Sequence, residues 1–119
     1  MKVCVIDDSY SMADFVRKYL PDCEVDGMRR LPEDETPLAQ YDVLIVDGEG
    51  IGNARYGHGV EFCKAYEKQG NNKKVIFFSG LLPKKSDMPI LEAKGVVWLT
   101  KGRDPQILAD FVTSFSATH

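Results

Sequence analysis

The sequence has no hydrophobic run longer than a β-strand, and this absence excludes a membrane-spanning segment. Its longest apolar stretches, among them residues 43–46 and 75–78, are far shorter than the about 20 residues that a helix needs to cross a bilayer. The chain begins with MKVCVIDD, which turns acidic at once and does not resemble a secretory signal. We therefore expect a cytoplasmic protein that makes no contact with membranes.

Concentrated positive charge is also absent. The chain has 15 Lys and Arg against 18 Asp and Glu, a formal net charge of −3, and no run of more than two basic residues. Proteins that bind nucleic acids gain much of their affinity by neutralising phosphates with clustered Lys and Arg. We therefore expect no direct binding to DNA or RNA.

Cysteine is scarce. Cys4, Cys23 and Cys63 are an odd number, lie far apart and form no Cys-x-x-Cys motif. Two of them stand in apolar patterns typical of a buried strand or helix, so we interpret them as buried free thiols. Free thiols of this kind indicate a reducing compartment such as the cytosol.

The remaining composition is that of an ordinary globular domain. Of the 119 residues, 44% are hydrophobic and 28% are charged, which argues against a disordered or fibrous chain. The sequence shows no internal repeats, low-complexity tracts or linkers. We therefore expect residues 1–119 to form a single domain.

Short apolar segments alternate along the chain with helical patterns. Most of these segments are continuously apolar, which indicates strands covered on both faces, whereas the second alternates and is typical of an edge strand. Strands that alternate with helices predict an α/β fold with a parallel sheet and helices on both sides. The predicted strands are residues 2–6, 23–28, 42–46, 74–78 and 96–100.

The helical patterns have recognisable start and stop signals. Ser11 and Asp14 loosely resemble a capping box at the start of a helix that Pro21 ends. Asp104 followed by Pro105 is typical of a cap and a first helical residue. The other predicted helices are residues 59–69 and 89–94, each followed by a glycine, and the proline-containing segment 31–40 accommodates at most one helical turn.

Polar side chains follow four of the predicted strands. Asp7 and Asp8 come after the first strand, Asp47 after the third, Ser79 after the fourth and Lys101 after the fifth. In parallel sheets the ligand site lies outside the carboxyl ends of the strands, so these groups should converge on one edge. Taken singly, an acid or a serine after a strand is often a helix cap, and a lysine there is often a surface residue.

A cluster of three carboxylates requires a counter-charge. Two unit charges about 4 Å apart repel by on the order of 4 kcal/mol at an effective dielectric constant near 20, and Lys101 alone does not neutralise three acids. A hard divalent cation would, and an all-oxygen ligand set favours Mg²⁺ over zinc. A carboxylate pocket with Mg²⁺, a hydroxyl and an ammonium suits a phosphoryl group.

In this order, the motifs VIDDS, VLIVDGEG, VIFFSG and VVWLTKG resemble the receiver domain of two-component response regulators, and the resemblance covers essentially the whole chain. It implies a flavodoxin-like, doubly wound α/β fold with five parallel strands in the order 2-1-3-4-5. The second and fourth helices of that fold should be shortened here. With no effector region after the last predicted helix, we expect a stand-alone receiver.

The resemblance also implies roles for the residues at the strand ends. Asp47 would be the phosphoacceptor, taking a phosphoryl group from a histidine kinase or a phosphotransfer protein. Ser79 and Lys101 would contact the phosphoryl group, and Trp98 would be the switch aromatic, unless it only fills the core or an interface. The Mg²⁺ would be held by Asp8 and Asp47 directly, by Asp7 through water and by the backbone carbonyl of Glu49.

The chain departs from the family pattern beside this site. Gly102 stands where the family usually has a proline in a cis bond, and a trans bond is expected here because a cis bond without proline costs about 3 kcal/mol. Gly48, Gly50 and Gly52 suggest a mobile loop and a metal site that is less pre-formed. Glu49 could orient an attacking water on the acyl phosphate or repel hydroxide, and its sequence position does not decide between these roles.

Three functions remain open at this point. The first is a phosphorylated switch that signals to a downstream effector protein, with no enzymatic activity beyond its own phosphorylation and dephosphorylation. The apolar last helix and the strand around Trp98 are compatible with a phosphorylation-dependent homodimer. The second is a phosphorylation-independent pseudo-receiver that acts as a protein-interaction module. The third is a Mg²⁺-dependent phosphatase with Asp47 as nucleophile, although Glu49 stands where such enzymes favour a second aspartate.

Overall fold

The computed structural model describes residues 1–9, 11–102 and 105–117, so the predicted cap Asp104 lies outside the described residues. The strands are β1 (Lys2–Ile6), β2 (Glu24–Met28), β3 (Val43–Val46), β4 (Lys74–Ser79) and β5 (Val97–Thr100). The helices are α1 (Met12–Tyr19), α2 (Gly59–Ala65), α3 (Met88–Ala93) and α4 (Pro105–Ala117), with the 3₁₀-helix η1 at Thr36–Gln40.

All strand pairs are parallel, and the sheet order is β2-β1-β3-β4-β5. The predicted α/β fold and the strand order 2-1-3-4-5 are therefore confirmed. In register, Ile6 lies beside Val46 and Val46 lies beside Phe77. Because these strands run in the same direction, the residues that follow β1, β3 and β4 come out at the same edge of the sheet.

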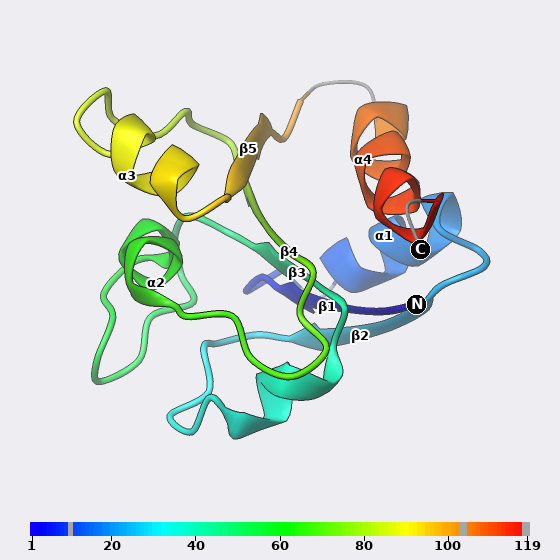
Figure 1. The fold of residues 1–119 in the computed structure, drawn as a ribbon, viewed down its shortest axis with the longest axis horizontal. Coiled ribbons are helices and arrows are strands. Elements are labelled where there is room, and N and C mark those ends of the chain that lie inside the picture. The colour runs from blue at the N-terminus through cyan, green and yellow to red at the C-terminus, as the bar shows by residue number, and fades with distance from the viewer. Residues whose placement is uncertain (10, 103–104, 118–119) are drawn as a thin grey trace.

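The helices cover the sheet in two layers (Figure 1). Helices α1 and α4 pack together on one face, and α2 and α3 lie side by side on the other. Strand β3 supplies both cores, because Val43 and Ile45 point to the α1 side while Leu44 and Val46 point to the α2 side. All four side chains are buried, which explains the continuous apolar run.

Strand β5 is less covered than its apolar sequence predicts. All four of its residues, Val97–Thr100, are only half-buried. The reason is its place at the edge of the sheet, beside β4 alone. The predicted edge position of the second strand is confirmed, since β2 pairs only with β1.

Helix α2 ends earlier than predicted, at Ala65 and not at residue 69. Tyr66 is extended, with φ −65° and ψ 126°, and its hydroxyl donates to the side-chain oxygen of Asn72. The amide of Asn72 in turn donates to the carbonyls of Leu38 (2.9 Å) and Tyr41 (2.5 Å). Residues 66–72 therefore bond to the η1 segment, and these tertiary contacts replace further helical turns.

The capping box predicted for α1 does not form. Ser11 has helical backbone angles (φ −85°, ψ −12°) and makes no side-chain capping bond. Its hydroxyl lies 3.1 Å from that of Ser9, and Asp14 pairs with Arg17 at 2.5 Å. The single turn at η1 and the short α3 agree with the predicted shortening of the second and fourth helices of the fold.

The three cysteines are free thiols, with Cys4 and Cys63 buried and Cys23 half-buried, as the sequence predicts. Burial raises the pKa of the Cys4 thiol to about 12, and the nearby charge of Asp26 adds to this effect. Cys4 therefore stays protonated at neutral pH and contributes to the core as a small apolar side chain. No helix in the described part of the chain has the length and hydrophobicity to span a membrane.

The start of α2 depends on a glycine that touches the end of β3. A Cβ placed on Gly59 would lie 1.7 Å from the carbonyl oxygen of Asp47, while the Gly59 N–H donates to the Gly48 carbonyl at 3.0 Å. Gly59→Ala should therefore push α2 away from the sheet and lower the free energy of unfolding by about 2–3 kcal/mol, measured by urea denaturation.

Gly80→Ala is the matched control for this substitution. A Cβ on Gly80 meets no atom within 4 Å, and this residue does not have a positive φ. We expect its effect on the free energy of unfolding to stay within about 0.5 kcal/mol. Equal losses in the two variants would contradict the close approach of α2 to β3.

Candidate functional site

The acids predicted to converge at the sheet edge are neighbours in the structure. Asp47 follows β3, and its N–H donates to the carbonyl of Ile6 in β1 at 2.9 Å. Asp7 follows β1, and its N–H donates to the carbonyl of Met28 in β2 at 2.9 Å. Both carboxyl groups are buried, with 5% of Asp7 and 8% of Asp47 exposed, whereas Asp8 is exposed.

The side chain of Lys101 joins the two buried acids. Its Nζ lies 2.6 Å from Asp7 Oδ2 and 3.0 Å from Asp47 Oδ1. The Lys101 N–H also donates to the Ser79 carbonyl at 2.8 Å, so backbone and side chain are both held. The lysine therefore points into the site, as the strand-end pattern predicts.

Gly102 explains how Lys101 is positioned without the family's proline. The Lys101–Gly102 bond is trans, as expected, and Gly102 has φ +82°. This left-handed conformation is accessible to glycine, whereas the ring of proline holds φ near about −65°. Gly102 thus has a backbone angle that a proline at this position could not adopt.

Three carboxyl groups could hold a metal ion together. Asp7, Asp8 and Asp47 each offer an oxygen, and these atoms all lie within 4.8 Å of one another. Three carboxylates and the Lys101 ammonium carry −3 + 1 = −2, a charge that one divalent cation neutralises. The donors are all oxygen atoms, which fits Mg²⁺.

Asp7 and Asp8 differ in their surroundings. Both oxygens of Asp7 already accept hydrogen bonds, Oδ1 from the Ser9 N–H at 2.9 Å and Oδ2 from Lys101. Asp8 lies against the loop that follows Asp47, because a Cβ on Gly50 would come within 2.3 Å of Asp8 Oδ2. Glu49 directly precedes Gly50, so its carbonyl belongs to the same loop segment, and its side chain is exposed.

Burial and charge shift the protonation of both partners in the central ion pair. Burial raises the pKa of Asp47 and the negative charge of Asp7 adds to it, although the bond from Lys101 acts in the opposite direction. Burial tends to lower the pKa of Lys101, but its bonds to Asp7 and Asp47 outweigh burial and raise it. The charged form of Lys101 is therefore favoured, whereas the ionised form of Asp47 is less favoured than in an exposed aspartate.

Ser79 ends β4 with its hydroxyl against the backbone that follows Asp47. Its side chain is buried, and a Cβ on Gly48 would lie 2.5 Å from Ser79 Oγ. The same oxygen accepts the N–H of Leu81 at 3.4 Å. The hydroxyl is therefore beside the predicted phosphoacceptor and also linked to the loop after β4.

Trp98 lies in β5 beside Phe77 of β4 and is half-buried. It packs against the core cluster on the α2 and α3 side, which contains Phe62 and Leu91. Among the described residues that line the site cleft, Phe77 is present and Trp98 is not. The structure thus brings the five strand-end residues together and leaves Trp98 outside the cleft lining, so its role as a switch stays a prediction.

Asp8 and Asp47 line a cleft of about 950 Å³ between α2 and the loop that follows β4. Val60 and Lys64 line it from α2, and Leu81 and Leu82 line it from the loop. No motif in the sequence indicates that these four residues line the site. The ion pair of 2.9 Å between Lys64 and Asp87 at its far end joins residues 23 positions apart, so no local pattern could have indicated it.

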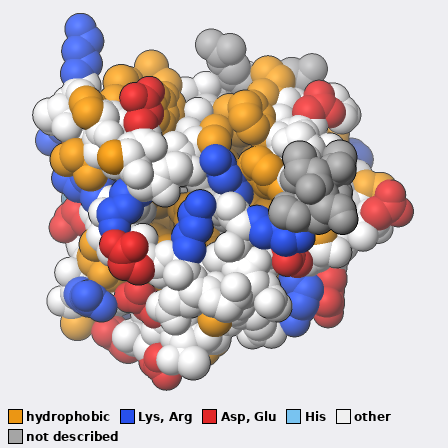
Figure 2. Space-filling model, viewed as in Figure 1, with side chains coloured by type: hydrophobic (Ala, Val, Ile, Leu, Met, Phe, Trp, Pro, Cys, Tyr) orange, Lys and Arg blue, Asp and Glu red, His pale blue; other side chains and the backbone are white. Residues whose placement is uncertain are grey.

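The exposed side chains in this region are mixed in type. Leu81 and Leu82 are 74% and 62% exposed, beside the exposed Lys84 and Lys85. Across the face of the molecule shown in Figure 2, basic, acidic and hydrophobic side chains are interspersed. His58 also lines the cleft and is exposed.

Comparison with known proteins finds matches among solved structures but none by sequence. No protein-family model matches the sequence, and no curated protein sequence matches it either. Solved structures do match. The receiver domain of the Francisella response regulator 1452 is 24% identical with a TM-score of 0.74, and the match covers 99% of this chain and 98% of that one.

Two further receiver domains match over nearly their whole length. The BeF3-activated receiver domain of DrrB is 21% identical with a TM-score of 0.75, covering 98% of this chain and 97% of that one. The receiver domain of a DNA-binding response regulator from Colwellia psychrerythraea 34H is 19% identical with a TM-score of 0.75, covering 98% of both chains. The chain therefore has the fold of response-regulator receiver domains, which confirms the resemblance at the level of fold.

Removing the charge of Asp47 should stabilise the metal-free protein. Because burial raises the pKa of Asp47, the folded state holds this proton more tightly than the unfolded state, and ionised Asp47 costs stability above its folded pKa. Asp47→Asn should raise the free energy of unfolding by on the order of 1 kcal/mol at about pH 7. Urea denaturation should show this gain shrinking as the pH falls through the folded pKa, and vanishing below the ordinary pKa of Asp.

Asp34→Asn is the control with the opposite sign. Asp34 is exposed, and hydrogen bonds from the hydroxyl (2.7 Å) and the N–H (3.0 Å) of Thr36 lower its pKa. Its ionised form is thus favoured by folding, and its loss should weaken the protein slightly at neutral pH. A loss of stability in Asp47→Asn at neutral pH would contradict the assignment of Asp47 as a disfavoured buried charge.

Proposed function

We propose that this protein is the phosphoacceptor of a two-component phosphorelay, with Asp47 as the residue that takes the phosphoryl group. The observation that carries the proposal is the cluster of Asp7, Asp8 and Asp47 with Lys101 and Ser79 at one end of an open cleft. The donor is a histidine kinase or a phosphotransfer protein, and Mg²⁺ is the cofactor.

The hydrogen bonds of Asp47 indicate which oxygen reacts. Oδ1 accepts the Lys101 ammonium at 3.0 Å and the Gly48 N–H at 2.8 Å. Both bonds orient the carboxylate, so we assign Oδ2 as the nucleophile. The new bond joins Oδ2 to phosphorus, the phosphorus–nitrogen bond to the donor histidine breaks, and the imidazole nitrogen keeps the electron pair. The product is an acyl phosphate on Asp47.

The neighbouring groups support this transfer by charge and by position. Asp8, Asp47 and the Glu49 carbonyl would hold Mg²⁺ directly and Asp7 would hold it through water, and the ion would supply positive charge to the phosphoryl group. Lys101 provides the second positive charge, from the side of β5, and is already held beside Asp47. Because Asp47 reacts as an anion and its pKa is raised, the transfer should slow as the pH falls.

Ser79 connects the phosphoryl group to the rest of the protein. After transfer its hydroxyl turns to donate to a phosphoryl oxygen and gives up its contact with the Leu81 N–H. The loop after β4 then repacks, and Trp98 follows this movement. A downstream effector protein, or a second copy of this chain in a phosphorylation-dependent homodimer, recognises the new surface. A cytoplasmic location is part of the same proposal.

The alternative is a pseudo-receiver that binds a partner without phosphorylation. The altered Lys101–Gly102 junction and the glycine-rich loop after Asp47 are the sequence features in its favour. The contacts of Lys101 with both Asp7 and Asp47 favour the phosphorylated switch instead, because they retain the lysine in the site. Binding of a partner that is unchanged in Asp47→Ala would select the pseudo-receiver.

Incubation with acetyl phosphate and Mg²⁺ should add one phosphoryl mass to the intact protein. The modification should be absent in Asp47→Asn, which keeps the shape of the side chain and loses the nucleophile. It should be retained in Asp34→Asn, which removes an exposed acid outside the cleft. Equal labelling of wild type and Asp47→Asn, or no labelling of either by intact-mass spectrometry, would contradict the proposal.

The fluorescence of Trp98, the one tryptophan in the sequence, should change when beryllofluoride and Mg²⁺ are added together. We expect the change because the Trp98 side chain packs against the core beside the site strands and should move with the loop after β4. Ser79→Ala should reduce the change at least about fivefold while leaving the protein able to accept phosphate. A fluorescence response of wild-type size in Ser79→Ala would refute the proposed link through Ser79.

A further inference from the structure

The loop after the proposed phosphoacceptor is anchored in a way that its glycines did not predict. Residues 48–58 join β3 to α2, and three of the first five are glycines. Ile51 in the middle of this loop is fully buried, and its carbonyl accepts the Leu31 N–H at 2.8 Å. The loop is therefore attached to the segment that follows β2.

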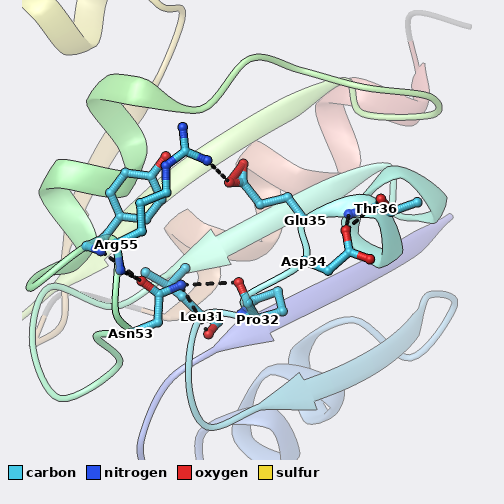
Figure 3. A network of polar contacts seen from close by, with 8 residues as sticks. Leu31, Pro32, Asp34, Glu35, Thr36, Asn53 and Arg55 are labelled. Carbon is cyan, nitrogen blue, oxygen red and sulfur yellow. Dashed lines mark hydrogen bonds and ion pairs between the residues drawn. The ribbon is translucent and has the colours of Figure 1, made fainter.

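The side chain of Asn53 makes the central contact between the two segments (Figure 3). Its Nδ2 donates to the carbonyl of Pro32 at 3.2 Å and, at the limit of 3.5 Å, to that of Leu31. Its Oδ1 accepts the N–H groups of Arg55 and Tyr56, both at 2.8 Å. One amide group therefore closes the turn 53–56 with its oxygen and joins it to the neighbouring segment with its nitrogen.

Two further contacts hold the same turn from outside. The Ala54 N–H donates to Glu33 Oε1 at 3.2 Å, and the guanidinium of Arg55 pairs with Glu35 at 3.2 Å. Figure 3 shows Arg55 reaching across to Glu35 above Asn53. The Arg55 side chain is 70% exposed, so its ion pair contributes little, and the bonds of Asn53 dominate.

The anchored loop carries one of the proposed metal ligands, the Glu49 carbonyl, and lies against another, Asp8. Its first residues, Gly48 to Gly50, contain the Glu49 carbonyl, and Gly50 lies against the Asp8 carboxylate. Asp8 is also contacted from the segment after β2, because the Nε of Arg29 approaches the Asp8 carbonyl oxygen at 3.5 Å. The position of the loop relative to Asp8 thus depends on where residues 51–56 are attached.

We propose that Asn53 is a positioning residue for the Mg²⁺ site, which it serves by clamping the loop 48–58 to the segment 31–35. This inference rests on the proposed function, since it assumes that Asp8, Asp47 and the Glu49 carbonyl bind the ion. Without the clamp, the glycines would allow the Glu49 carbonyl many orientations. Fixing one of them on metal binding costs conformational entropy, which would reduce the affinity for the metal. With the clamp, the carbonyl is held in place before the ion arrives.

Asn53→Asp separates the two halves of the contact. An aspartate keeps an oxygen that accepts the N–H groups of Arg55 and Tyr56, so the turn itself is retained. It has no donor for the carbonyls of Leu31 and Pro32, so the clamp is lost. The added negative charge by itself would favour a cation, and a weaker Mg²⁺ affinity therefore cannot arise from charge.

Isothermal titration with Mg²⁺ alone should show the dissociation constant of Asn53→Asp raised about tenfold over wild type. Amide hydrogen exchange of residues 48–50 in the metal-free protein should accelerate by at least about tenfold. Asn71→Asp is the matched control. It adds the same charge just before the amino end of β4, whereas the site lies at the carboxyl ends of the strands. Its Mg²⁺ affinity should change by less than about twofold.

Glu33→Ala is a second variant that does not alter Asn53, and its side chain is exposed. It removes the acceptor of the Ala54 N–H and should weaken Mg²⁺ binding in the same direction but by less than Asn53→Asp. Wild-type affinity and exchange in Asn53→Asp would overturn the role of Asn53 and leave the metal site standing. Absence of Mg²⁺ binding in the wild type would overturn the metal site itself, and the inference with it.

Discussion

The ammonium of Lys101 lies between the carboxylates of Asp7 and Asp47, and the organisation of the site follows from this placement. Parallel strands deliver three acids to one edge of the sheet, where their mutual repulsion opposes folding. Lys101 offsets one of these charges and leaves two uncompensated. These two negative charges are what the proposed divalent cation would neutralise.

Close approach of backbone segments is the second condition for the site. Gly48 allows the Ser79 hydroxyl to lie against the residue after Asp47, and Gly59 allows α2 to start against the Asp47 carbonyl. The two loops around the cleft differ in how they are held. The loop with Asn53 is attached to the segment after β2, whereas the loop after β4 exposes Leu81 and Leu82. In the proposed function, the first loop would serve as a fixed support and the second would respond to Ser79.

Much of the fold was predictable because strands that are buried on both faces have continuous apolar sequences. The continuous apolar runs of β1, β3 and β4 are read directly from the sequence, as are the residues that follow them. Predictions failed where contacts distant in sequence replaced local ones. Asn72 draws residues 66–72 toward η1 and ends α2 early, and the edge position of β5 exposes a strand whose sequence resembles a central one.

The sequence by itself determined the parallel sheet and the chemistry at its carboxyl edge, because strand periodicity and the residue after each strand are local properties. Only the tertiary structure decided how that chemistry is held. Lys101 reaches Asp7 and Asp47, which lie 94 and 54 positions earlier in the sequence. The clamp from Asn53 to Pro32 joins residues 21 positions apart. The turn at Gly102 depends on a backbone angle. Such contacts arise when the chain packs, and no pattern of neighbouring residues encodes them.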